Sequence, residues 1–79
     1  MTVKINMYTK EGDNMVITLD VTHNQEHFFI TKSISVVEGK AKEQYVSDAY
    51  NLALAEINAW KDDIETVGQE YNPSTKKFM

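Results

Sequence analysis

The chain has 79 residues, eight of them lysine and twelve acidic, and it contains neither cysteine nor arginine. This length suits one domain with a small core. The absence of cysteine excludes disulfides and thiolate metal sites. The absence of arginine argues against direct nucleic-acid binding, because arginine reads guanine edges and clamps phosphates. No apolar run approaches the about 18 residues that cross a bilayer, so we expect no membrane association and a cytoplasmic protein.

The first half of the chain predicts an antiparallel sheet, because apolar and polar residues alternate there. The alternation runs from Val3 to Met7, from Met15 to Val21 and from Phe28 to Val37. Glu38-Gly39 would form a two-residue hairpin loop, which predicts a fourth strand over 40–46.

The second half predicts one helix, because the apolar period lengthens to three or four residues. We expect this helix at 48–66, with Ser47 as N-cap and Asp48 at the positive end of the helix dipole. A start near residue 41 is the alternative, since Lys40–Gln44 are good helix formers. The residues expected to face the sheet are Ala49, Ala53, Ile57, Trp60, Ile64 and Val67, flanked by Tyr50, Leu52 and Leu54.

These elements define an α+β fold in which an antiparallel sheet of three to four strands packs against one C-terminal helix. We expect a single domain over 1–67, a glycine C-cap at Gly68, and an irregular tail over 68–79 that holds Pro73.

The motifs that carry chemistry are few. His23-Asn24-Gln25-Glu26-His27 matches H-x-x-E-H, the pattern of a zinc hydrolase. That chemistry needs both imidazoles on one helical face, whereas this segment joins two strands, so we interpret both histidines as solvated. The sequence also lacks a nucleophile with a partner at a recognisable spacing and a phosphate-binding glycine loop. We therefore predict no catalytic residues, no metal and no cofactor.

Acidic residues are concentrated in the second half of the chain, where residues 43–70 hold seven of them against Lys61 alone. A partner steered by charge should therefore be basic. On the expected outward side of the helix lie Asn51, Asn58, Asp62 and Glu65, with Asp63 beside them.

A second candidate surface is the sheet face away from the helix. Tyr8, Val16 and Phe29 are expected there, among threonines and lysines. An apolar patch of this kind leaves a homodimer open as an alternative.

The C-terminal residues Gly68, Tyr71, Asn72, Thr75 and Phe78 resemble the G-x-x-Y-[DN]-x-x-T-x-x-F segment of small phage tail and baseplate-associated proteins. Lys77 stands where that segment commonly has glycine. The whole layout is similar to short acidic phage proteins, anti-CRISPR proteins among them. The resemblance implies a non-enzymatic phage-type protein that acts in the host cytoplasm.

Together these observations predict an inhibitor that binds a basic host protein through the acidic helix face, with Tyr71 and Phe78 as further anchors. The alternatives are a structural protein of a phage tail or baseplate and a small regulatory or nucleic-acid-binding module.

Overall fold

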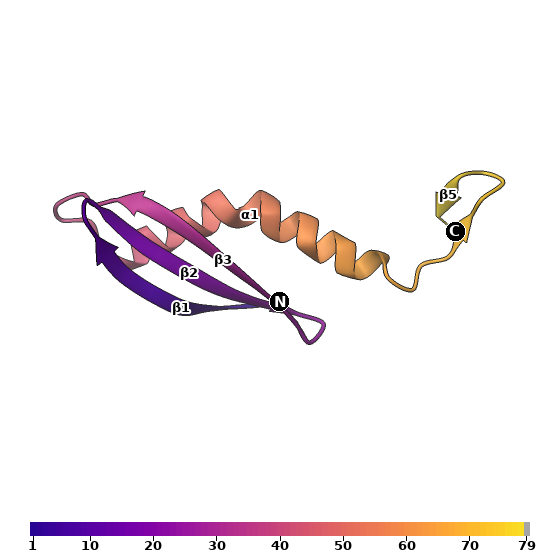
Figure 1. Ribbon diagram of the computed structural model, residues 1–79, viewed down its shortest axis with the longest axis horizontal. Coiled ribbons are helices and arrows are strands. Elements are labelled where there is room, and N and C mark those ends of the chain that lie inside the picture. The colour runs from indigo at the N-terminus through magenta and orange to yellow at the C-terminus, as the bar shows by residue number, and fades with distance from the viewer. Residues whose placement is uncertain (79) are drawn as a thin grey trace.

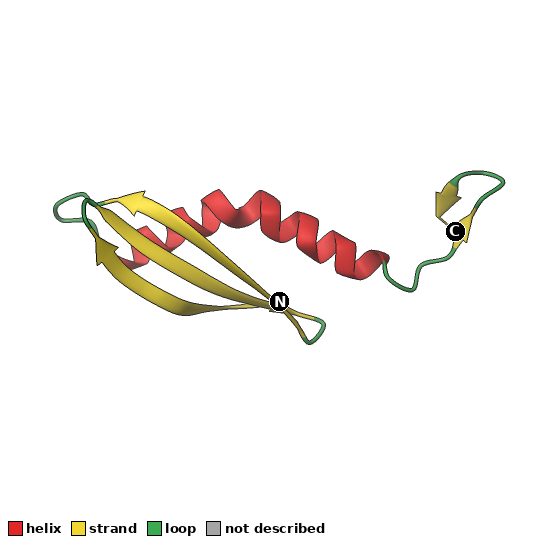
Figure 2. Cartoon of the chain, in the orientation of Figure 1, coloured by secondary structure: helices red, strands yellow, loops and turns green. Residues whose placement is uncertain are grey.

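The computed structural model describes residues 1–78 and contains one three-stranded sheet, one long helix and a small C-terminal hairpin (Figure 1). The elements, in chain order, are β1 (Thr2–Glu11), β2 (Asn14–His23), β3 (Glu26–Ser35), α1 (Lys42–Thr66), β4 (Tyr71–Asn72) and β5 (Lys77–Phe78). The predicted α+β class is confirmed. Figure 2 shows α1 crossing one face of the sheet and leaving the other face uncovered.

The sheet is antiparallel throughout, in the order β1-β2-β3. Two-residue loops join its strands, as the paired residues Glu11 with Asn14 and His23 with Glu26 require. In the second loop Asn24 and Gln25 have φ angles of 51° and 67°. Positive φ at both positions is typical of a type I′ turn, whose twist matches that of the strands.

A bulge in β1 changes which of its residues face the helix. Ile5 pairs with Leu19 but Met7 pairs with Thr18, so Asn6 is the extra residue. Because an inserted residue reverses the alternation, Tyr8 turns to the helix side and packs against the core. The prediction that Tyr8 lies on the outer face is therefore wrong.

The core lies between α1 and the two strands β2 and β3. Ile17, Leu19, Val21 and Ile57 are the largest fully buried side chains. Ala49 and Ala53 are also fully buried, and their small size lets the first turns of α1 approach the sheet closely. Trp60 is only partly buried, and two residues predicted on or beside the stripe, Val67 and Leu52, are exposed at 84% and 59%.

The helix begins six residues earlier than we predicted. α1 starts at Lys42 with Ala41 as N-cap, so the start at Ser47 and the fourth strand over 40–46 are both wrong. The backbone N–H of Ala41 donates to the side-chain oxygen of Gln44 at 2.9 Å. The hydroxyl of Tyr45 then fixes the preceding loop, because it accepts from the N–H of Val37 at 2.9 Å and donates to its carbonyl at 3.0 Å.

The observed start of α1 predicts different effects on stability for substitutions at Ala41 and at Ser47. Ala41→Ser should raise the free energy of unfolding by about 1 kcal/mol, because alanine cannot accept the N-cap hydrogen bond that serine accepts. Ser47→Ala, now inside the helix, should change it by less than about 0.5 kcal/mol. Urea denaturation of both variants measures this. If Ser47→Ala instead lowered the free energy of unfolding by about 1 kcal/mol, Ser47 would be the N-cap and the helix would begin after it.

The molecule is elongated, with extents of 58 × 22 × 17 Å. Its length comes from α1, which runs past the end of the sheet, and from the hairpin of β4 and β5, which stands away from the rest (Figure 1). Among the described elements, β4 and β5 contact only each other. The tail over 68–79, predicted to be irregular, thus contains an ordered hairpin at 71–78.

Candidate protein-binding surfaces

The first candidate surface comprises the five predicted helix residues and is called the acidic surface below. Asn51, Asn58 and Asp62 are spaced seven and four apart, which places them on one side of α1, and all three are exposed. Asp63 and Glu65 lie in the same part of the helix and are also exposed. The five residues predicted to contact a partner therefore reach solvent.

Glu65 has a second role that the sequence did not reveal. The Nε2–H of His23 donates to Oε1 of Glu65 at 3.0 Å, and the His23 side chain is only 14% exposed. The His23 ring also contacts the Trp60 ring edge to face, with 6.4 Å between the ring centroids, and the Phe28 ring stacks on Trp60 with a centroid distance of 5.3 Å. These contacts hold the second half of α1 against the tip of the β2–β3 hairpin, so the expectation of a solvated His23 is wrong.

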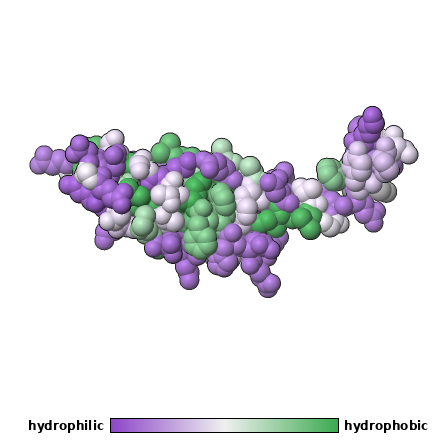
Figure 3. Space-filling view, viewed as in Figure 1, coloured by the Kyte–Doolittle hydropathy of each residue, from purple (hydrophilic) through white to green (hydrophobic). Residues whose placement is uncertain are grey.

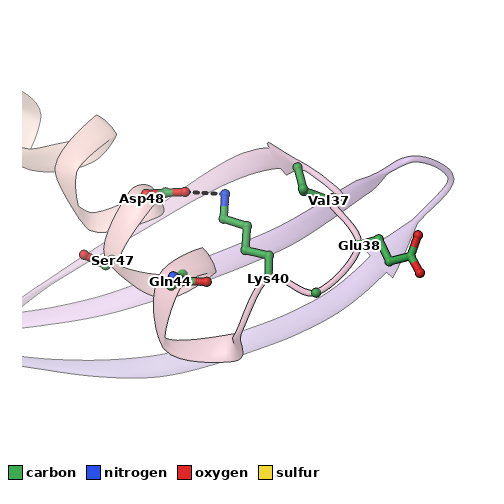
Figure 4. A pocket seen from close by; sticks show the side chains of 7 residues that line it. Val37, Glu38, Lys40, Gln44, Ser47 and Asp48 are labelled. Atoms are coloured by element: carbon green, nitrogen blue, oxygen red, sulfur yellow. Dashed lines mark ion pairs between the residues drawn. The ribbon is translucent and has the colours of Figure 1, made fainter.

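Lysines neutralise two other acidic residues of the helix. Nζ of Lys32 lies 2.7 Å from Oε1 of Glu56. Figure 4 shows the Lys40 side chain reaching from the loop before α1 to the carboxylate of Asp48. Within residues 1–78, the side chains of Glu43, Asp62 and Asp63 form no ion pair. The unneutralised negative charge of α1 thus lies at its first turn and at its exposed second half.

The two histidines of the H-x-x-E-H motif lie on opposite faces of the sheet. His23 pairs with Glu26 across the β2–β3 turn and turns to Trp60, while Nδ1 of His27 donates to Oδ1 of Asp20 at 2.8 Å on the outer face of the sheet. In the part of the chain that the structure describes, no three histidine or acidic residues gather as a metal site requires.

Two of the three residues predicted on the outer face of the sheet are found there. Val16 and Phe29 lie there, since their neighbours Ile17 and Ile30 are buried toward α1. Val16 is buried, whereas Phe29 is 56% exposed and its ring stacks on that of His27 with 6.1 Å between the ring centroids. The bulge in β1 also turns Met7 to this face, opposite Thr18, where it is 38% exposed. Met7 and Phe29 are thus the exposed large apolar side chains there, and Tyr8 is not among them.

The second candidate surface is the C-terminal hairpin, residues 71–78. Tyr71 pairs with Phe78, and their rings meet edge to face at 5.8 Å. Both remain more than half exposed, at 53% and 57%. The Asn72 side chain accepts from the backbone N–H of Ser74 at 2.9 Å, which stabilises the turn.

The third feature is an open groove of about 400 Å³ between the first strand and the helix, called the β1–α1 groove. It exists because the backbone of α1 lies close to β2 and β3 but not to β1. Val3 and Ile5 form one wall and are 38% and 46% exposed. The groove is lined by Val3, Ile5, Glu43, Val46, Ser47 and Tyr50. Figure 3 shows that apolar side chains reach the surface over the body of the molecule and beside the hairpin.

Within residues 1–78, no helix combines the length and the apolar character that crossing a bilayer would require. Comparison of the chain with protein-family models, with curated proteins and with solved structures found no match.

Proposed function

We propose that this chain is a non-enzymatic protein-binding module that attaches to a basic partner through the acidic surface. Its biological role would be that of a phage-type inhibitor, which covers a functional surface of a host protein. The observation that carries the proposal is the pair Asp62 and Asp63, two adjacent exposed carboxylates without an ion pair within residues 1–78.

Electrostatics supports a basic partner. Exposed carboxylates on one rigid helix accelerate encounters with a positively charged surface, and rim charges of this kind act mainly on association rate. Asn51 and Asn58, on the same side of α1, offer amide donors and acceptors to the contact. Trp60 and the His23–Glu65 contact hold this part of the helix in place, so binding would order few side chains.

The test is a comparison of what the tagged chain and two charge variants capture from a lysate of the native host. Asp62→Lys/Asp63→Lys should abolish capture of the specific partner, and capture by the unchanged chain should fall steeply as salt rises. Mass spectrometry of the bound fractions identifies and quantifies the partner.

The matched control is Glu11→Lys/Glu38→Lys, which changes the net charge equally. Both of its residues are exposed and lie outside α1. This control should capture the same partner as the unchanged chain. Equal loss of capture in both variants would mean that only total charge matters, and unchanged capture by the Asp62/Asp63 variant would refute the proposed surface.

A structural component of a phage tail or baseplate is the second candidate. It is favoured by the exposed aromatic pair on the projecting hairpin, in the segment that resembles tail and baseplate-associated proteins. Recovery of the chain in purified particles would support this function, and its absence from particles, together with capture of a basic host protein, would favour the inhibitor.

A further inference from the structure

We propose that the hairpin of one copy of this chain docks in the β1–α1 groove of a second copy. This inference deepens the second candidate function, because it names how the chain would assemble. It uses none of the acidic-surface residues, so it stands or falls separately from the inhibitor proposal.

The two surfaces complement each other in polarity. The hairpin presents Tyr71 and Phe78, each more than half exposed although the two rings already contact each other. The groove presents Val3 and Ile5, which α1 leaves uncovered. Aromatic side chains entering an apolar groove of about 400 Å³ would remove apolar area from water on both sides.

The charges also complement each other. The hairpin carries Lys76 and Lys77, neither of which forms an ion pair within residues 1–78. The groove contains Glu43, the acidic residue in the first turn of α1, which has no ion pair in that part of the chain either. Apolar docking would therefore bring opposite charges together at the rim, where they favour the correct orientation.

The hairpin does not occupy this groove of its own chain, because β4 and β5 contact only each other among the described elements. The nearest helix residue of the groove, Tyr50, lies about 24 Å along α1 from Thr66, at 1.5 Å per residue. The link from Thr66 to Tyr71 spans at most about 18 Å when fully extended. The backbone of Tyr71 therefore stays about 6 Å short of the helix wall even with the link fully extended. A second copy meets no such constraint, so we assign the occupant to it.

Because the hairpin and the groove are different surfaces, the contact is heterologous and copies would add head to tail. The chain should thus form dimers and longer species as its concentration rises. Sedimentation velocity over a concentration series measures this. A chain that stays monomeric at every soluble concentration would overturn the inference.

Two variants test the pairing itself. Tyr71→Ser/Phe78→Ser removes the aromatic pair, and Ile5→Lys places a charge in the groove that repels the basic hairpin. Each variant alone should remain monomeric. An equimolar mixture should form a one-to-one dimer, because the first variant keeps an intact groove and the second keeps an intact hairpin.

Controls separate this result from misfolding and from the inhibitor proposal. Both variants should keep the helical circular dichroism of the unchanged chain, since the hairpin contacts no other described element and Ile5 is 46% exposed. Leu52→Ser, on an exposed position outside the groove, should assemble as the unchanged chain does. Asp62→Lys/Asp63→Lys should also assemble normally. A mixture that stays monomeric, or assembly that persists in either variant alone, would refute the contact.

Discussion

Ile57→Ala should lower the free energy of unfolding by about 2–5 kcal/mol, the largest effect of any substitution that we predict. Ile57 is fully buried, on the face of α1 that packs against the sheet. Truncation to alanine removes apolar contacts and leaves a cavity that the surrounding strands fill only in part. Because a domain of this size buries a small core, the loss is a large share of its stability. Urea denaturation followed by circular dichroism measures it.

The matched control is Leu52→Ala on the same helix. Leu52 is 59% exposed, so its truncation should change the free energy of unfolding by less than about 0.5 kcal/mol. If the two variants lost similar stability, the position of α1 on the sheet would have to be revised.

Trp60→Ala should lower the free energy of unfolding by about 3 kcal/mol, at the low end for a large aromatic residue because Trp60 is only partly buried. The substitution removes the stack on Phe28 and the edge contact with His23. Both contacts hold the second half of α1 on the β2–β3 hairpin. Amide hydrogen exchange should therefore become faster around 58–66, beyond the global loss seen in denaturation.

Trp60→Phe distinguishes the contribution of the aromatic contact with Phe28 from that of side-chain volume. A phenyl ring at this position retains an aromatic contact with Phe28 and should cost about 1 kcal/mol, an aromatic pair being worth about that amount beyond its buried area. Equal losses for alanine and phenylalanine would show that the ring contacts do not stabilise the helix end.

The fold class was predictable because both halves of the chain have clear apolar periods. The prediction for Tyr8 was wrong because of one local feature of the backbone. The extra residue Asn6 turned the Tyr8 side chain from the outer face of the sheet to the helix side, and a bulge leaves no signal in a pattern of alternation. The start of α1 was misplaced because Ser47 and Asp48 have the residue types of a helix N-terminus, whereas in the structure Ala41 is the N-cap and Ser47 lies inside the helix. The helix-forming residues from Lys40 to Gln44 were the correct signal.

The candidate surfaces, too, were predictable from the sequence only in part. The exposure of Asp62 and Asp63 followed from helical periodicity alone. The contact of His23 with Glu65 did not, because 42 residues separate them and only the folded arrangement brings them together. The β1–α1 groove also escaped sequence reasoning, since it results from the lateral position of α1 over β2 and β3.

The most direct test of the proposed binding function is the association rate constant with the captured basic partner, measured at several salt concentrations. The unchanged chain should associate rapidly, and its rate should fall steeply as salt rises. Asp62→Lys/Asp63→Lys should associate at least about tenfold more slowly at low salt, with a weaker salt dependence. Equal association rates for the two proteins at low salt would contradict the claim that the acidic surface recognises the partner.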